Sequence, residues 1–419
     1  GGTGGQGSAQ GQAMSADPDY LALVRQLSER MVLAQRPIRI LDAIKWSGTV
    51  RKDFFARGCR ELPRVDRDYY REKNPLEFEP AAKRAEFQDI ERDIARKLGQ
   101  LNPLAQIMRR MCREYRSVVQ MLEARGEPDF GTISVDLYGS ASDVFHAGDP
   151  TLADLGTAME DTLTNLLQNR SMQESPKDIP AAQAVEMLNE RLLKVFPDAG
   201  IRVLLNDQMT ADAAAGSDYL KIRSDARFNR LDIDVLEVHE GWVHLGTTLN
   251  GGAQPACTFL GKGPPSATTT QEGLAVLTEI LTLRSSPSRL YRLINRVRAV
   301  TLAEDGASFV DVFHYLRDHG MGEDDAWSIA MRVFRGSTPD GKPFTKDLAY
   351  MRGFVQTYNF LRLAMSEGRL DSLPVLFCGK ITLEDIHTWR LLIDEGVVEA
   401  PRFVPPHFAD LQGLATWMS

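Results

Sequence analysis

Residues 239–244 read His-Glu-Gly-Trp-Val-His, and this segment constrains the local fold more than any other feature of the chain. On a regular α-helix two histidines five residues apart point about 140° away from each other. A π-type turn takes up one extra residue and returns both imidazoles to one face. Gly241 lies inside the segment and tolerates such a backbone distortion best. The spacing therefore predicts a locally irregular helix with His239 and His244 on one side.

Two histidines beside a glutamate indicate a zinc site, with one Zn²⁺ expected per chain. A catalytic zinc takes three protein ligands and keeps the fourth position open. Glu272, in the run Gln-Glu-Gly-Leu-Ala, is the candidate third ligand. We expect it to open a helix after a loop at residues 250–270, with a cap among the threonines at 268–270. The alternatives are two ordinary buried histidines and an ordinary first-turn glutamate.

Two further glutamates have candidate roles at this site. Glu240 directly follows the first histidine. A carboxylate there takes a proton from a zinc-activated water and passes it to the leaving amine, so Glu240 is the predicted general base. Glu279 lies seven residues after Glu272, on the same helical face. It either orients one of the histidines or forms a surface salt bridge.

Helical spacing dominates residues 20–126. Apolar residues recur at three- and four-residue steps in residues 81–98 and 107–124, and Pro103 marks a helix start. The other elements predicted before the motif are a strand at 131–138, a helix at 181–196, and short strands at 201–205 and 219–222. After the motif helices the chain is predicted to be mostly helical, with breaks at 336–343 and 370–374.

We interpret the chain as a helix-rich α+β protein with a small mixed sheet beside the motif helix. Three regions are expected: a disordered tail or cloning remnant at 1–16, a helical region at 17–130, and a zinc-dependent catalytic region at 131–419.

Composition narrows the classes of partner. With 57 acidic and 49 basic side chains, the chain has a formal net charge of −8, which disfavours nucleic-acid binding. The sequence has no apolar run long enough to cross a bilayer and no export signal, so we expect a cytoplasmic protein without a membrane partner. The four cysteines form no CxxC pair and are predicted to be free thiols: Cys59, Cys112, Cys257 and Cys378.

The stretches VHEGWVH, TTLNG and TQEGLAVLTE together resemble the QEGLA-motif family of metallopeptidases, which includes the microtubule-associated tyrosine carboxypeptidase. The resemblance spans roughly residues 137–360, over half the chain. It implies a gluzincin-like fold in which His239, His244 and Glu272 bind zinc and Glu240 is the catalytic base. The compact sequence is typical of a bacterial member.

The resemblance also implies a substrate class, the C-terminal tail of a peptide or protein, from which one residue, such as an aromatic one, is removed. An acidic protein is poorly steered to the acidic tail of tubulin, so tubulin is not the expected partner.

A carboxypeptidase must hold the terminal carboxylate of its substrate, which Arg does best through paired hydrogen bonds. Arg335 is the leading candidate, and Lys346 is the second; a structural ion pair is the alternative for Arg335. Tyr350 is a candidate donor to the oxyanion, or else a packing residue.

Several other features have weaker functional interpretations. His314 and His319 are also five apart, but no glutamate follows His314, so they are interpreted as helix-face residues. The strand at 219–222 is a candidate for pairing with an extended substrate. Two arginine sets are interpreted mainly as solvated helix faces. For Arg109, Arg110, Arg113 and Arg116 the alternative is a phosphate or acidic-partner site, and for Arg289, Arg292 and Arg296 it is an approach for acidic chains.

The sequence thus predicts a zinc carboxypeptidase. The alternatives are a zinc endopeptidase or aminopeptidase with the same chemistry, and a non-catalytic regulatory protein that keeps the zinc fold. The presence of Glu240 argues against the last, because a structural site needs no general base.

Overall fold

The computed structural model describes residues 16–209 and 211–419, so the predicted tail lies outside the described residues except for Ala16. Helices dominate the first part of the chain: α1 (Pro18–Gln35), α2 (Ile40–Ile44), α3 (Gly48–Ala56), α4 (Arg67–Lys73), α5 (Pro80–Leu98), α6 (Pro103–Glu123) and α7 (Pro128–Tyr138). The helices predicted at 81–98 and 107–124 are confirmed as α5 and α6.

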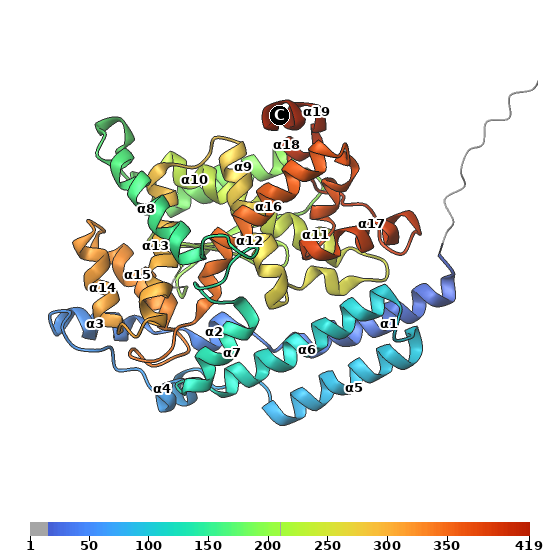
Figure 1. Cartoon of the computed structure of the whole chain (residues 1–419), viewed down its shortest axis with the longest axis horizontal. Helices are drawn as coiled ribbons and strands as arrows, with labels where there is room; N and C mark the ends of the chain where they lie inside the picture. The colour runs from blue at the N-terminus through green and yellow to red at the C-terminus, as the bar shows by residue number, and fades with distance from the viewer. Residues whose placement is uncertain (1–15, 210) are drawn as a thin grey trace, which may run out of the picture.

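Helix α6 shows why this region is helical. Pro103 occupies its first turn, where the missing N–H costs nothing, and the Asn102 side chain accepts from the Ala105 N–H at 3.1 Å. Its apolar face is buried against its neighbours, and α1, α5 and α6 lie side by side along one edge of the molecule (Figure 1). The predicted boundary between residues 130 and 131 stays a prediction, and α7 runs across it.

The predicted strand at residues 131–138 is wrong, because this segment belongs to helix α7. Its alternating Ile and Val residues fit a strand, but the flanking residues fit a helix. Pro128 starts the helix, and Gly139 follows its end with a φ of +87°. Contacts to a distant segment hold the helix, since the Ser134 hydroxyl accepts from the Thr345 N–H at 2.9 Å.

A small mixed sheet lies in the middle of the chain, as predicted. The elements around it are α8 (Leu152–Leu167), η1 (Arg170–Met172), β1 (Ile179–Pro180), α9 (Ala181–Val195), β2 (Arg202–Asn206), β3 (Ala213–Ala215), β4 (Tyr219–Arg223) and β5 (Arg227–Phe228). Strand β4 is central: it pairs parallel with β2, from Arg202 opposite Tyr219, and antiparallel with β3. Strands β1 and β5 form a separate antiparallel pair.

The motif helices follow the sheet: α10 (Arg230–Leu236), the π-helix η2 (Glu237–Leu245), α11 (Gly246–Gly252), the short 3₁₀ turn η3 (Thr258–Gly261) and α12 (Pro265–Leu281). The loop predicted at residues 250–270 is therefore wrong in extent, because η3 and the first turns of α12 occupy much of it. Pro265 begins α12 after Pro264, and the threonines at 268–270 lie inside the helix and do not cap it.

The rest of the described chain is again mostly helical: α13 (Pro287–Glu304), α14 (Phe309–Asp318), α15 (Glu323–Phe334), η4 (Thr345–Leu348), α16 (Ala349–Ser366), η5 (Leu370–Ser372), η6 (Pro374–Phe377), η7 (Leu383–Asp385), α17 (Ile386–Asp394), α18 (Pro406–Ala409) and α19 (Leu411–Met418). The break predicted at 336–343 is confirmed, whereas the one at 370–374 contains short 3₁₀ turns.

Four large hydrophobic clusters hold these elements together. One joins the N-terminal helices to the segment around Trp389, and a second fills the space between α3, α13, α14 and α15. A third lies between α9, the sheet and η2, and a fourth between α12, α16 and the C-terminal helices. Helix η2 contributes Val238 and Trp242 to the third cluster and Val243 to the fourth, so it lies between two cores. None of the helices at 16–209 and 211–419 is long and apolar enough to span a membrane.

Candidate metal centre

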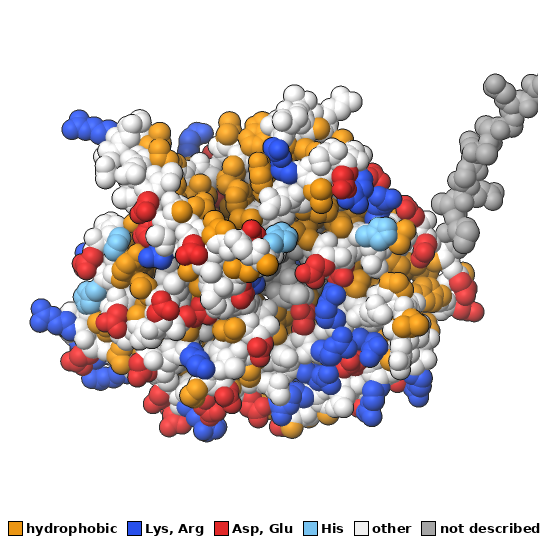
Figure 2. Space-filling model, viewed as in Figure 1, with side chains coloured by type: hydrophobic (Ala, Val, Ile, Leu, Met, Phe, Trp, Pro, Cys, Tyr) orange, Lys and Arg blue, Asp and Glu red, His pale blue; other side chains and the backbone are white. Residues whose placement is uncertain are grey.

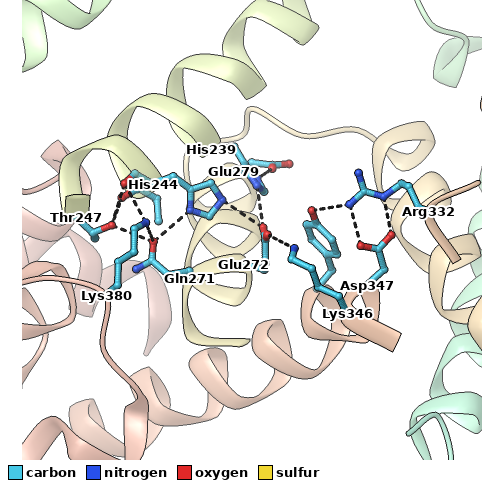
Figure 3. A network of polar contacts seen from close by, with 12 residues as sticks. His239, His244, Thr247, Gln271, Glu272, Glu279, Arg332, Lys346, Asp347 and Lys380 are labelled. Carbon is cyan, nitrogen blue, oxygen red and sulfur yellow. Dashed lines mark hydrogen bonds and ion pairs between the residues drawn. The ribbon is translucent and has the colours of Figure 1, made fainter. Parts of the chain in front are cut away.

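The five-residue spacing of the histidines is accommodated by a π-helix, as the sequence predicts. Residues Glu237–Leu245 form η2, and winding with i→i+5 hydrogen bonds brings residues five apart onto one face. The rings of His239 and His244 lie with centroids 4.7 Å apart and nearly perpendicular. Both Nε2 atoms point toward α12 (Figure 3).

Gly241 is needed for space in this helix. A Cβ on Gly241 would lie 2.5 Å from Cδ2 of Leu192 on α9, well inside normal van der Waals contact. Its φ is not among the positive values of the described glycines. The absence of a side chain therefore lets α9 pack closely against the π-helix.

Glu272 reaches the histidines from the middle of α12 rather than from its first turn. One of its carboxylate oxygens, Oε2, lies 3.1 Å from Nε2 of His239 and 3.3 Å from Nε2 of His244. Burial opposes ionisation of Glu272, but His244 and Lys346 outweigh burial and hold its pKa well below the usual range. Glu272 is therefore a carboxylate at neutral pH.

These three atoms form a donor set that fits a metal ion. Four ligands about 2.0–2.1 Å from a tetrahedral zinc stand roughly 3.3 Å from one another, close to the separations between Glu272 and the two imidazoles. A second possible set of ligands contains Glu240 in place of Glu272. Ligand atoms of His239, Glu240 and His244 lie within 4.8 Å of one another. The largely buried group can bind a metal ion, and Glu240 is near enough to touch a molecule held there.

Glu279 orients His239. Its Oε1 lies 2.6 Å from Nδ1 of His239, and it also accepts from Arg289 Nη2 at 3.1 Å. Glu279 is fully buried, so a surface salt bridge is excluded. Burial opposes its ionisation, but Arg289 and His239 lower its pKa to about 2.

The same carboxylates act on His239. Burial by itself lowers the pKa of His239, but Glu272 and Glu279 outweigh burial and raise it to about 10. The site thus favours a positive charge at this position, which a divalent cation supplies as well as a proton does.

Gln271 orients His244 in the same way. Its Oε1 lies 3.2 Å from Nδ1 of His244, and it accepts from Thr247 Oγ1 at 2.9 Å and from Lys380 Nζ at 3.2 Å. Sequence reasoning missed these roles of Gln271, Thr247 and Lys380. Thr247 belongs to the stretch TTLNG and Gln271 to TQEGLAVLTE, whereas nothing in the sequence near Lys380 indicates a site.

Lys346 lies on the other side of Glu272 from His244 (Figure 3), and Tyr350 lies near His239. Nζ of Lys346 is 3.5 Å from Oε1 of Glu272, and the Tyr350 ring is 6.3 Å from that of His239. The Tyr350 oxygen accepts from Nη2 of Arg332 at 3.3 Å, which leaves its O–H free to donate elsewhere. Arg332 is itself held by Asp347 through two hydrogen bonds of 2.6 and 2.8 Å, and sequence reasoning missed both residues.

Arg335 lies outside this network, at the end of α15. It is buried over the ring of Phe344, and its Nε and Nη2 have no hydrogen-bond partner among the described residues. Burial lowers the pKa of Arg335 to about 10, with Arg332 acting in the same direction, so it remains charged at neutral pH. Uncompensated N–H groups of this kind are costly and suit an anionic ligand.

The remaining predicted features lie elsewhere or are already paired. Strand β4 cannot accept a substrate strand, because β2 and β3 occupy both of its edges. His314 and His319 are exposed and bond backbone carbonyls of Cys59 and Tyr315.

The predicted arginine faces are largely paired as well. Arg109, Arg113 and Arg116 surround Glu91, and Arg110 pairs with Asp385. Figure 2 shows basic side chains gathered over α5 and α6. On α13, Arg289 and Arg292 pair with Glu279 and Glu174, while Arg296 stacks 4.8 Å from the Tyr350 ring centroid.

Comparison with known proteins identifies the family. No curated protein matches the sequence. One solved structure, a presumed lipoprotein from Colwellia psychrerythraea, aligns over 98% of this chain and 78% of its own, with a TM-score of 0.41 and 13% identity. That likeness is too weak to support an argument. The family model of the microtubule-associated tyrosine carboxypeptidase matches residues 52–419, so the chain belongs to that family.

Proposed function

We propose that the protein is a zinc-dependent carboxypeptidase with a gluzincin-like core, acting on the C-terminal tail of a peptide or protein. The observation that carries the proposal is the convergence of two imidazole nitrogens and one carboxylate oxygen on a single point. Two histidines and a glutamate are a known ligand set of catalytic zinc. The family name supports the reaction class.

Each residue around the donor set has a role in this proposal. Zinc bound here would polarise a peptide carbonyl and make a nearby water more acidic. Glu240 takes the proton as the water oxygen bonds to the carbonyl carbon, and returns it to the nitrogen as the C–N bond breaks. Tyr350, held by Arg332, donates to the carbonyl oxygen as it becomes negative.

Arg335 is the proposed partner of the terminal carboxylate, supported by its buried and unpartnered N–H groups. Lys346 is less suited to that role because it pairs with Glu272, and we propose that it steadies the metal ligand instead. We propose that a large apolar or aromatic C-terminal side chain contacts Ile280, Leu290 and Phe354, which are partly buried and pack against the cluster that includes Tyr350. The net charge of −8 disfavours the acidic tubulin tail as substrate.

The test is product analysis on a set of peptides with diverse C-termini. The zinc-loaded protein should remove single C-terminal residues, read by mass spectrometry. Internal cuts would indicate an endopeptidase, and removal of N-terminal residues would indicate an aminopeptidase. A protein that binds zinc but cleaves no peptide would be a non-catalytic regulatory protein.

Arg335→Ala then tests the carboxylate partner. This variant should keep its zinc but lose activity on free-acid peptides, by about tenfold or more, because a charged hydrogen bond contributes roughly 1.5–3 kcal/mol. C-terminally amidated peptides should lose far less. Arg292→Ala is the matched control, since Arg292 lies on α13 and pairs with Glu174. Equal losses on both peptide forms would remove Arg335 from the site.

A further inference from the structure

Three side chains meet at the amide oxygen of Gln271: those of His244, Thr247 and Lys380. Lys380 follows η6, 136 residues after His244, and its Nζ donates to the His244 carbonyl at 3.3 Å and to Gln271 Oε1 at 3.2 Å. The Gln271 oxygen also accepts from Thr247 and lies 3.2 Å from Nδ1 of His244. Figure 3 shows Lys380, Gln271 and Thr247 grouped on the far side of His244 from Glu272.

This arrangement fixes which way the Gln271 amide faces. A lysine ammonium has three donors and no acceptor, so the group facing Lys380 must be the amide oxygen rather than the NH₂. The oxygen can only accept, and therefore Nδ1 of His244 must carry the hydrogen. Nε2 is then left with its lone pair toward Glu272, which is the form of imidazole that binds a metal.

The backbone of the segment that carries Lys380 is held by two hydrogen bonds. Its backbone N–H donates to the carbonyl of Leu260 at 2.8 Å, and the Leu383 N–H donates to Thr270 Oγ1 on α12 at 3.2 Å. A Cβ on Gly379 would lie 2.7 Å from Cβ of Leu260, so the segment is pressed closely onto η3. These contacts fix the position of the backbone from which the Lys380 side chain extends toward Gln271.

The two histidines are supported by acceptors of different strength. His239 bonds the carboxylate of Glu279, whereas His244 bonds a neutral amide. A neutral oxygen is the weaker acceptor, and an adjacent cation holds its dipole in place. Lys380 also bonds the carbonyl of His244 near the end of the π-helix, and the Thr248 hydroxyl donates to the same oxygen at 2.8 Å.

We propose that Lys380 is a positioning residue for the metal centre. It fixes the Gln271 amide so that Nδ1 of His244 carries the hydrogen and Nε2 faces the ion. The proposal rests on the metal site of the proposed function, but it does not depend on the peptidase reaction.

The test measures metal binding without turnover. Metal-free protein is titrated with Co²⁺ while its visible spectrum is recorded, and Zn²⁺ affinity is measured by competition with a chelator. Lys380→Met, which keeps an unbranched chain in the partly buried site, should bind both ions about 10–100-fold more weakly and give an altered Co²⁺ spectrum. Lys262→Met is the control, because Lys262 is a half-buried lysine in the neighbouring segment, and it should bind like the wild type.

A second variant tests whether Lys380 acts through Gln271. Gln271→Met should also weaken binding, and the double variant should lose little more than Gln271→Met alone. Thermal unfolding of each metal-free variant separates a lost fold from a lost ligand geometry. Wild-type affinity and spectrum in Lys380→Met, or losses that multiply in the double variant, would overturn the proposal. A wild-type protein that binds no metal would instead overturn the proposed function.

Discussion

At the scale of single residues, the proposed function gives different roles to the two glutamates beside His239 and His244. Substitutions of Glu240 and Glu272 should therefore have different effects. In the proposed function Glu240 is the base beside the donor set, whereas Glu272 is one of its three donors. Glu240→Gln should keep its zinc and lower turnover by at least about a hundredfold, the lower range for general acid–base catalysis. Glu272→Gln should lower zinc affinity, with activity partly restored by excess zinc. Metal content and turnover, measured on the same samples, check both; loss of zinc from Glu240→Gln would contradict these roles.

At the scale of secondary structure elements, α12, which carries Glu272, packs closely against α16, which carries Tyr350. Gly273 follows Glu272, and a Cβ there would overlap the backbone of Gly353 on α16, the helix that carries Tyr350. Gly273→Ala should therefore force the helices apart and lower the free energy of unfolding by about 1–3 kcal/mol or more. Gly252→Ala is the control, because a Cβ at Gly252 meets nothing within 4 Å; it should be neutral or stabilise by up to about 1 kcal/mol. Denaturant unfolding of both variants checks the difference, and equal stabilities would show that the two helices can separate freely.

At the scale of the whole molecule, the candidate metal centre lies between two hydrophobic cores. The histidines lie on η2, which contributes to the core beneath the sheet, and Glu272 lies on α12, which belongs to the core around α16. An ion that binds only the folded chain stabilises it by about 4 kcal/mol at roughly 1,000 times its Kd. Removal of zinc by a chelator should thus lower the Tm by several degrees in calorimetry. His239→Ala should have the lower Tm already and show no further shift with chelator; a chelator effect of equal size in that variant would place the stabilising ion elsewhere.

The sequence by itself determined the features that depend on neighbouring residues. The five-residue spacing of His239 and His244 required a π-turn, because the rotation per residue of a helix is fixed by its backbone. The helices with Pro in the first turn and apolar residues at helical steps were predicted nearly to their ends. The strand predicted for α7 failed because the alternation was weighed without the flanking Pro128 and Gly139, and because packing against the segment after α15 also holds the helix.

Only the tertiary structure decided what surrounds the donor set. Glu279 is fully buried against His239, and Asp347 holds Arg332 against Tyr350, yet charged residues in helices look alike in sequence whether exposed or paired. Lys380 reaches His244 from 136 residues away, and no local pattern announces a contact made by chain folding. Propensity and periodicity act over a few residues, whereas the partners of a buried polar group are set by which distant elements pack together.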